Sequence, residues 1–391
     1  METGIATVTV EVLSSAESIL DDWEDLASRA GTVFSSRPSF VLNVAGALRL
    51  NVRFVVVRRG CRVVALAPLD TVRRGPFVLA KVVGSTLGVP LEFLSDDEEA
   101  SDVLLGGVAD QGWMLTGDSM IANDPTVVRL GRHGAWDADA LVRERVPVVV
   151  LRPGDTASSI RSAKSLKRLR QYRSKIERQS EYRVEQIRDV AHLDARWNDI
   201  VSLAADSVEG TDKVNYLVAP HGEFARDFLR SEARAGRLCI AGLVVDGRWV
   251  AHEIGVRTHR RMEGWLTHYD PSIGKLQPGH QLIEWFADTH DRLGVVELDQ
   301  GVGVNKIKSV WANAGVRRIA GDGGSEGLVA LWVHEVGVTQ PSFDSGPNPL
   351  GAAQSGRAGP RSMISAAAPA GNRWRFATAS RDTARDPAKF R

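Results

Sequence analysis

The sequence predicts an α/β fold of mixed, mostly antiparallel sheets flanked by helices, and its second half carries the clearest evidence. Two strand-like apolar runs, Leu238–Val245 and Arg248–Thr258, are joined by Asp246-Gly247. An Asp-Gly pair between two such runs is a strong signal for a two-residue hairpin turn. The two runs are therefore expected to pair as antiparallel neighbours.

The segment after this hairpin alternates between strands and helices. A strand is expected over 264–270, a break over 276–280, and an amphipathic helix over 281–293, where apolar residues form one side. A second strand, 295–298, then leads into the glycine-containing loop 299–303 and another helix. The expected order is thus three antiparallel strands, helix, strand, helix.

An anion site is expected where the first of these helices begins, because Pro278-Gly279 stands directly ahead of it. The free N–H groups and the dipole of a helix start both favour negative charge, and glycine allows the backbone to approach a ligand closely. The candidate binding residues are Gln277, Pro278, Gly279, His280 and Gln281.

The order of these elements is that of the GNAT N-acyltransferase core, and several motifs point to one family. The chain resembles the CelD/BcsL type of GNAT-like acyltransferases in three motifs, which are His268-Tyr269-Asp270, Pro278-Gly279, and Asp299-x-x-x-Gly303-x-x-x-x-Lys308-x-x-Trp311. Upstream, Trp23, Ser39-Phe40 and a basic segment around Lys167 are similar to the same family, so the resemblance spans roughly residues 20 to 320. Ile307 stands where the family usually has tyrosine, so a hydroxyl role at that position is absent or supplied elsewhere.

The resemblance implies a tandem GNAT-like arrangement, similar to that of the FemABX transferases. It implies acyl-CoA, acetyl-CoA or longer, as the co-substrate, with its pyrophosphate held at the helix start near Gly279. Two neighbouring strands of the fold splay apart in front of this helix. The acceptor is then a small-molecule amine, an amino acid or an amino sugar, with a link to envelope or polysaccharide metabolism.

The catalytic candidates follow from what acyl transfer from a thioester to an amine requires, namely a donor to the carbonyl oxygen and a group that deprotonates the amine. His252 and Glu253 alternate along one strand, so only one faces the splayed region. Asp299 either binds or deprotonates the amine or caps its loop, and Lys308 either contacts an acyl carbonyl or phosphate or is a solvated lysine. Asp270 either borders the cleft or turns the loop through Asp270-Pro271.

Three parts of the chain are expected. A diverged N-terminal GNAT-like domain is expected over residues 1–150, and the C-terminal GNAT acyltransferase domain over 151–338. A disordered tail is expected over 339–391, because Gly, Pro, Ser, Ala and Arg dominate that segment. The first domain has Asp96-Asp97-Glu98-Glu99 ahead of its helical run, and four carboxylates would repel a pyrophosphate. It is therefore expected to support the second domain or to bind the acceptor.

A basic amphipathic helix is expected within 160–180, where positions 161–178 hold eight basic residues and one acid. Its charges either form a solvated face or contact an anionic substrate, a coenzyme phosphate or the surface of a membrane. Aromatic stacking residues are sparse in this segment, so nucleic acid is expected only in the FemABX alternative, in which tRNA supplies an aminoacyl group.

Composition narrows the remaining classes. The chain has 391 residues and a net charge of +1, which gives no global reason to expect nucleic acid. Signal-peptide and membrane-span patterns are absent, so a cytoplasmic location is expected, with peripheral membrane contact left open. The nine histidines show no zinc-binding spacing, so no metal is expected. The hypotheses are an acyl-CoA-dependent N-acyltransferase, an aminoacyl-tRNA-dependent FemABX-like transferase, and a catalytically silent binding or scaffold protein, which Ile307 suggests.

Overall fold

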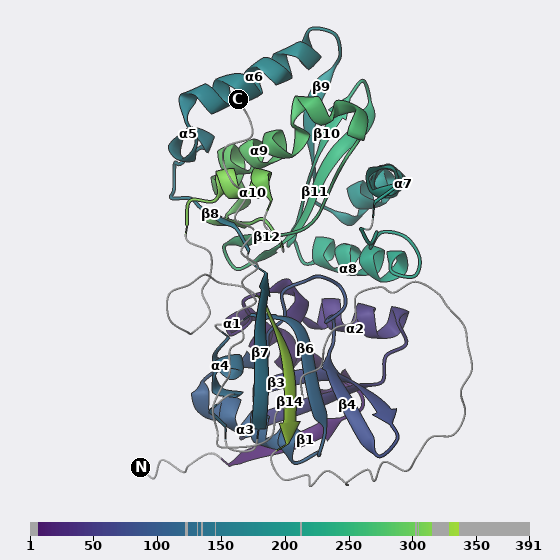
Figure 1. The fold of residues 1–391 in the computed structure, drawn as a ribbon, viewed down its shortest axis with the longest axis vertical. Coiled ribbons are helices and arrows are strands. Elements are labelled where there is room, and N and C mark those ends of the chain that lie inside the picture. The colour runs from purple at the N-terminus through teal and green to yellow at the C-terminus, as the bar shows by residue number, and fades with distance from the viewer. Residues whose placement is uncertain are drawn as a thin grey trace, which may run out of the picture.

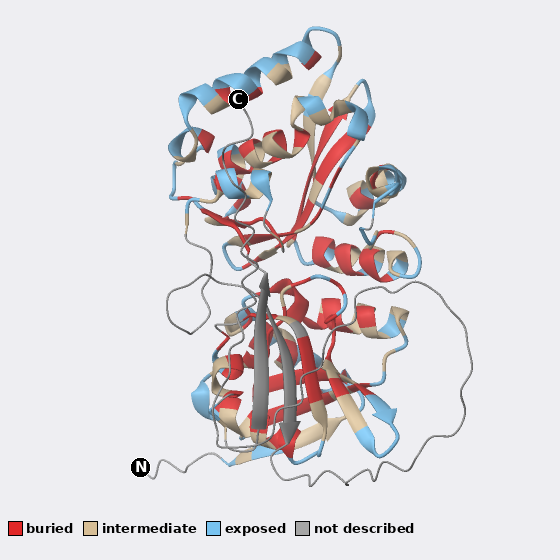
Figure 2. Cartoon of the chain, in the orientation of Figure 1, coloured by how far each residue is buried: buried red, intermediate tan, exposed pale blue. Residues whose placement is uncertain are grey.

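The computed structural model describes residues 7–121, 124–130, 132–133, 136–144, 146–211, 213–301, 303, 305–314 and 328–335. The tail expected at 339–391 lies outside the described residues. Two halves, each built on a twisted sheet with helices packed against it, are stacked end to end (Figure 1). Buried residues fill the strands and the helix faces that cover them, as Figure 2 shows.

The first sheet is formed mainly by the N-terminal part of the chain. Its strands are β1 (Val8–Leu13), β2 (Val52–Arg59), β3 (Arg62–Arg74), β4 (Phe77–Val82), β5 (Leu94–Ser95), β6 (Met114–Ile121), β7 (Trp136–Glu144) and β14 (Leu328–Glu335). The order is β1-β2-β3-β4-β6-β14-β7, with β5 beside β3, and among the described residues of this sheet only the strands β4 and β6 pair in parallel. The helices of this half are η1 (Glu17–Ile19), α1 (Leu20–Arg29), η2 (Phe34–Ser36), α2 (Pro38–Ala47), α3 (Glu98–Ala109) and α4 (Pro125–Leu130).

The second sheet has the order β8-β13-β12-β11-β10-β9. Its strands are β8 (Val148–Val150), β9 (Tyr182–Ile187), β10 (Leu238–Val245), β11 (Arg248–Thr258), β12 (Arg261–Tyr269) and β13 (Glu297–Asp299). Within the described part of the chain, β12 and β13 are the only strands of this sheet that pair in parallel. The helices are α5 (Ala157–Ile160), α6 (Ala163–Glu177), α7 (Val190–Val208), α8 (Gly222–Arg234), η3 (Pro271–Leu276), α9 (Pro278–Leu293) and α10 (Lys306–Trp311).

The same order of elements occurs in both halves. Three antiparallel strands, β2-β3-β4 in one half and β10-β11-β12 in the other, are followed by a helix, α3 or α9. The next strand in that order, β6 or β13, pairs in parallel with the third. The predicted α/β fold of mostly antiparallel sheets flanked by helices is confirmed, and its element order repeats in tandem. The helix predicted to begin at Gln281 begins three residues earlier, at Pro278, because proline is favoured in the first turn, where its missing N–H leaves no bond unmade.

The sheets do not follow the predicted boundary at residue 150. β8 lies within 1–150 but pairs with β13 of the second sheet, and β14 lies within 151–338 but pairs with β6 and β7 of the first. The second half is therefore inserted between two neighbouring strands of the first sheet. Apolar patterning shows which residues are strands, but it does not show which sheet a distant strand joins.

The two halves meet through a mixed apolar and polar interface. Helix α2 packs against α8, and the rings of Phe34 and Phe228 stack with their centroids 5.4 Å apart. The buried Arg37 donates to Glu232 Oε2 at 3.0 Å, and the Phe34 N–H donates to Glu263 Oε1 at 3.0 Å. Burial raises the pKa of Glu263 to about 8, and the nearby Asp299 raises it further.

Candidate active site

The start of α9 is an open helix terminus in the second half. Gln277, its N-cap, adopts the left-handed conformation with φ 57° and ψ 53° and makes no side-chain cap. The N–H groups in the first turn of a helix have no intrahelical acceptor, so those of Gly279 and His280 are available to a ligand. A Cβ added at Gly279 would meet only Ile307 Cδ1, at 3.7 Å. The terminus therefore has the free donors and the space that the sequence predicted for an anion.

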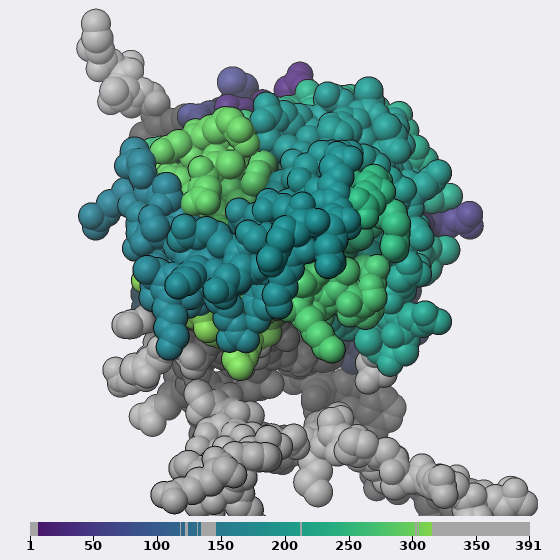
Figure 3. Space-filling view, turned by 90° about the horizontal axis from the view of Figure 1, so that it is seen from above, coloured from purple at the N-terminus to yellow at the C-terminus, as the bar shows by residue number. Residues whose placement is uncertain are grey.

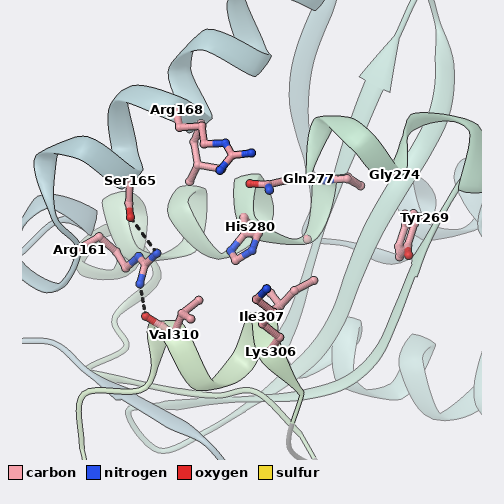
Figure 4. Close-up of a pocket in the computed structure, with 13 residues that line it drawn as sticks. Arg161, Ser165, Arg168, Tyr269, Gly274, Gln277, His280, Lys306, Ile307 and Val310 are labelled. Carbon is pink, nitrogen blue, oxygen red and sulfur yellow. Dashed lines mark hydrogen bonds between the residues drawn. The ribbon is translucent and has the colours of Figure 1, made fainter. Parts of the chain in front are cut away.

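This terminus opens into a cavity of about 380 Å³ between α6, η3, α9 and α10 (Figure 4). The residues that line it are Arg161, Ser165, Arg168, Leu169, Tyr269, Gly274, Gln277, Pro278, Gly279, His280, Lys306, Ile307 and Val310. Three of them are cationic, and no carboxylate is among them. The cavity therefore offers positive charge beside the helix start, and apolar surface from Ile307, Val310 and Leu169 along its wall.

The cation Arg161 is held firmly in this cavity. It donates to the carbonyl oxygen of Val310 and to Ser165 Oγ, the latter at 3.2 Å, as the dashed lines in Figure 4 show. Its guanidinium lies 5.2 Å from the ring centroid of Trp311. The Trp311 indole in turn donates to His280 Nδ1 at 2.8 Å, and burial lowers the pKa of His280, with Arg161 lowering it further. His280 is thus a neutral acceptor within the wall.

Two strands of the second sheet separate near this region. β13 pairs with β12 only over the first three residues of β12, and Glu263 opposite Asp299 is the last pair. β12 then runs on to Tyr269 without that neighbour, while the chain turns from β13 into the loop before α10. The two strands thus separate in front of α9, which is the splayed arrangement expected of the fold.

Glu253 faces this separation. It lies opposite Thr267 in the β11–β12 register, and the Thr267 hydroxyl donates to Glu253 Oε2. A Cβ placed on Gly264 would come within 2.7 Å of Glu253 Oε1 and 3.0 Å of the Asp299 carbonyl oxygen. Burial raises the pKa of Glu253 to about 7, although Thr267 and Lys308 lower it. A carboxylate with this pKa changes its protonation state near neutral pH and is suited to accept a proton.

The side chain of Lys308, on α10, extends toward Glu253. Its Nζ donates to the Gly301 carbonyl oxygen at 3.1 Å, and its positive charge lowers the pKa values of Glu253 and Asp299, against the effect of burial. Gly301 has a φ of +75°, and a Cβ there would lie 2.5 Å from the Gly264 carbonyl oxygen, so only glycine fits. The loop is therefore packed tightly onto β12 beside Glu253.

Asp299 shapes this loop. Its side chain is buried, and Oδ1 accepts the Gly301 N–H at 2.8 Å. Burial raises its pKa to about 6, against the lowering influence of that hydrogen bond. Of the two roles predicted for Asp299, these contacts favour the loop cap over the amine base.

His252 is on the other face of the strand. It is fully buried, accepts the Trp249 indole N–H at Nδ1 over 3.0 Å, and its Nε2 lies 2.9 Å from His268 Nδ1. Burial holds the pKa of His252 well below its usual value and lowers that of His268 to about 4. Of the two residues, only one of which was expected to face the splayed region, Glu253 is turned toward it and His252 away from it, because successive side chains of a strand point to opposite faces.

Two other predicted residues have local structural partners. Asp270 accepts the Ser272 N–H at 2.8 Å and lies 3.4 Å from Arg248, so it turns the loop into η3 and its pKa is lowered by the Ser272 hydrogen bonds. Gln281 is buried, with its amide donating to the Leu276 carbonyl and its oxygen accepting from Tyr182. Its side chain thus ties α9 to its surroundings and does not line the cavity.

Sequence reasoning did not assign Arg161, Arg168, Lys306, Tyr269 or Thr267 to the site. Both arginines come from the basic segment predicted within 160–180, Arg161 as the C-cap of α5 and Arg168 on α6; the charge of this segment was apparent from the sequence, but its position beside α9 was not. Lys306 begins α10 shortly after the glycine-containing loop, and Tyr269 forms part of the motif His268-Tyr269-Asp270. Contacts between segments far apart in sequence, rather than local patterns, bring them together.

The equivalent helix start in the first half is closed. The Asp97 side chain caps α3 by accepting the Ala100 N–H, and it also binds Arg59. Arg29 pairs with Asp96 at the same end. Carboxylates thus occupy the place that an anionic ligand would take at this helix start.

Across the described residues, no three His, Cys, Asp or Glu side chains gather closely enough to hold a metal ion. The same residues include no helix whose length and apolar character would suit a bilayer crossing.

Comparisons with known proteins agree with this fold. Residues 163–309 match the family model described as "Acetyltransferase (GNAT) domain", which includes α6 and ends within α10. These residues therefore form a GNAT-type acetyltransferase domain, and the protein is an enzyme of the acyltransferase type. No curated protein matches it.

Solved structures similar to the chain extend over both halves. The crystal structure of FemX has a TM-score of 0.56 at 9% identity, over 83% of this chain and 95% of that one. A conserved protein of unknown function from Bacteroides thetaiotaomicron has a TM-score of 0.50 at 11% identity, over 83% and 99% of the two chains. L-PGS from Bacillus licheniformis has a TM-score of 0.49 at 14% identity, over 80% and 91%. The first two establish similarity of fold across the tandem.

Proposed function

We propose that this protein is an acyl-CoA-dependent N-acyltransferase of the CelD/BcsL type, which transfers an acyl group, acetyl or longer, to the amino group of a small amine, amino acid or amino sugar. One observation carries the proposal. The open start of α9, beside Arg161, Arg168 and Lys306, is in the same half as the point where β12 and β13 separate, and the charge of Lys308 acts on Glu253 there. An anion-binding end and a proton-accepting group are thus arranged on the same edge of the sheet.

The donor is bound at the first of these places. The pyrophosphate accepts from the N–H groups of Gly279 and His280, and the positive end of the α9 dipole favours its charge. Arg168 and Lys306 compensate the remaining charge from opposite walls of the cavity. The pantetheine arm then follows the apolar wall of Ile307 toward the separation of β12 and β13.

The chemistry takes place in the cleft. The neutral amine attacks the thioester carbonyl carbon, a C–N bond forms and the C–S bond breaks. Glu253 accepts the proton that the amine loses, and the thiolate leaves and takes up a proton from solvent. The Lys308 ammonium stabilises the negative charge that develops on the carbonyl oxygen, and Asp299 keeps the Gly301 loop in position for it.

The acceptor and its cellular context are inferred from the family resemblance alone. We place the reaction in the cytoplasm, where acyl-CoA is available, and expect an acceptor from envelope or polysaccharide metabolism.

A thermal-shift screen tests the proposal. Acyl-CoAs of increasing chain length are compared with free CoA, with charged tRNA and with uncharged tRNA. A ligand that binds only the native protein increases the free energy of unfolding by mass action, by about 2.7 kcal/mol at a concentration 100 times Kd, and so raises the melting temperature. Acyl-CoA should stabilise the protein, and a shift with charged tRNA alone would contradict the proposal.

A FemABX-like, aminoacyl-tRNA-dependent transferase is the second candidate. The similarity of fold to FemX across the tandem and the many cations of α6 favour it. A catalytically silent scaffold has less support. Ile307, at the position where the family usually has tyrosine, still lines the cavity, and Glu253 and Lys308 lie close enough to interact without that tyrosine.

A further inference from the structure

Helix α6 carries more positive charge than the cavity beside it uses. Six exposed cations lie on α6 or at its C-cap, and five of them, all except Arg170, are here called the α6 basic face, which consists of Lys164, Lys167, Arg168, Lys175 and Arg178. At about 100° per residue these positions fall on one side of the helix. The only carboxylate ion pair found for α6 among the described residues joins Arg173 to Glu284, and Arg173 is on the opposite side.

The α6 basic face is long and one-sided. From Lys164 to Arg178 it spans fourteen helical steps, which is about 21 Å at ~1.5 Å per residue. Figure 3 shows this side of the molecule, where the blue residues of α5 and α6 form the outer surface beside the green residues of α9 and α10. Arg168 lines both this surface and the cavity at α9, so the face begins at the mouth of the donor site.

The apolar side of α6 is already used. Leu166, Leu169 and Ile176 are buried, and the first two belong to the core of the second half. A helix that binds a bilayer by insertion needs such a side free. The ring of Tyr172 has Arg168 and Lys175 near it, at 5.6 and 6.0 Å from its centroid, so it offers no open platform for stacking a base. Charge is therefore what this face presents to a partner.

We propose that the α6 basic face docks an acidic acyl-carrier protein, which presents the acyl thioester on its own phosphopantetheine arm. This rests on the proposed function, because the arm is the same as that of acyl-CoA and enters the same cavity. Its phosphate binds at the start of α9, where a protein attached to it lies against α6. A row of cations about 21 Å long matches an acidic helix better than one compact nucleotide.

The test measures binding, so it needs no acceptor. A bacterial carrier protein is loaded with the acyl group that gives the largest shift as acyl-CoA, and its Kd for the full-length protein is measured by fluorescence anisotropy. The variant Lys175→Glu/Arg178→Glu reverses two charges at the end of α6 far from the cavity, and Lys175→Gln/Arg178→Gln removes them with less effect on the helix. Arg62→Glu/Arg74→Glu is the matched control, since both are exposed and lie on the first half.

We expect the charge reversal to weaken binding of the loaded carrier protein at least about tenfold, and the neutral variant to weaken it less. The Kd of acyl-CoA should stay within about twofold in every variant, and the control should bind the carrier protein like the native protein. Raising the salt concentration should weaken carrier-protein binding in the native protein more than in the reversal variant.

Two results would overturn the inference. One is a carrier-protein affinity that the reversal leaves unchanged while acyl-CoA still binds, in which case the proposed function stands and this docking site does not. The other is a reversal that abolishes binding of tRNA or of anionic phosphatidylglycerol vesicles, measured in parallel, while the loaded carrier protein does not bind. Failure of acyl-CoA itself to bind would instead contradict the proposed function.

Discussion

Glu253 and Thr267 lie directly opposite each other across β11 and β12, and the threonine hydroxyl donates to the carboxylate. The pair sits where β12 loses its second neighbour, and burial raises the pKa of Glu253 to about 7. A hydrogen bond that keeps a half-buried carboxylate partly ionised near neutral pH is what a proton acceptor needs.

Glu253→Gln should therefore lower kcat/KM by about 10²-fold or more, since the amide cannot take the amine proton. In the native enzyme the rate should rise with pH through about 7, because only the ionised carboxylate acts as base. Thr267→Val removes a contact that lowers this pKa, so its profile should shift to higher pH. Steady-state kinetics from pH 5.5 to 9 decide the matter, and an unchanged profile in the glutamine variant would exclude Glu253 as the base.

Lys308→Met and Lys306→Met separate two roles of lysine on α10. Lys308 reaches the Gly301 carbonyl oxygen near Glu253, whereas Lys306 lines the donor cavity. We expect Lys308→Met to lower kcat by about 10²-fold, as for loss of an oxyanion donor, and Lys306→Met to raise the KM for acyl-CoA with little change in kcat. The reverse pattern would show that the two assignments are exchanged.

Gly279→Glu should weaken acyl-CoA binding at least tenfold, because it places a carboxylate where the pyrophosphate approaches. Gly279→Ala is the matched control, since its methyl group would meet only Ile307 Cδ1 at 3.7 Å and should be tolerated. Isothermal titration with acyl-CoA measures both. If the alanine and glutamate variants lose affinity equally, the bulk of the side chain rather than its charge is responsible. If the glutamate variant binds acyl-CoA as tightly as the native protein does, the pyrophosphate binds elsewhere.

Glu263→Gln tests the interface between the halves. The pKa of Glu263 is raised to about 8 in the folded protein by burial, above its value in the unfolded chain, so folding binds a proton at this position. The corresponding stability is fully present at acidic pH, below the unfolded pKa, and is lost as pH rises through about 8. The melting temperature of the native protein should therefore fall relative to Glu263→Gln between pH 5 and pH 9. The exposed Glu177→Gln should show no such trend.

His252→Ala should act on stability and not on chemistry. It leaves the buried Trp249 indole N–H and His268 Nδ1 without their partner, which costs about 1–3 kcal/mol for an unsatisfied buried group. The free energy of unfolding is measured with urea, and kcat is measured on the folded fraction. A loss of kcat like that of Glu253→Gln, with normal stability, would restore His252 as a catalytic candidate.

The sequence allowed the local elements to be predicted, but not every contact between them. The Asp246-Gly247 turn and the Pro278-Gly279 helix start are encoded within a few residues, and both are present. Which of His252 and Glu253 faces the cleft depends on the register of β11 with β12, and a shift of one residue exchanges the two faces. The cap that Asp299 makes to Gly301 depends on the left-handed turn that follows β13.

The membership of β14 in the first sheet has a consequence for how the two halves are joined. Leu328, where β14 begins, is paired with Glu144, where β7 ends, so the chain leaves and re-enters the first sheet at adjacent points. The second half is thus connected to the first at both of its ends and not by a single linker. Two connections restrict rotation of one half relative to the other about a single hinge. The chain connects the two halves twice, once after β7 and once before β14. A protease that cuts one of these connections should leave a nicked protein whose two pieces stay together under native conditions, because the paired strands and the second connection still hold them.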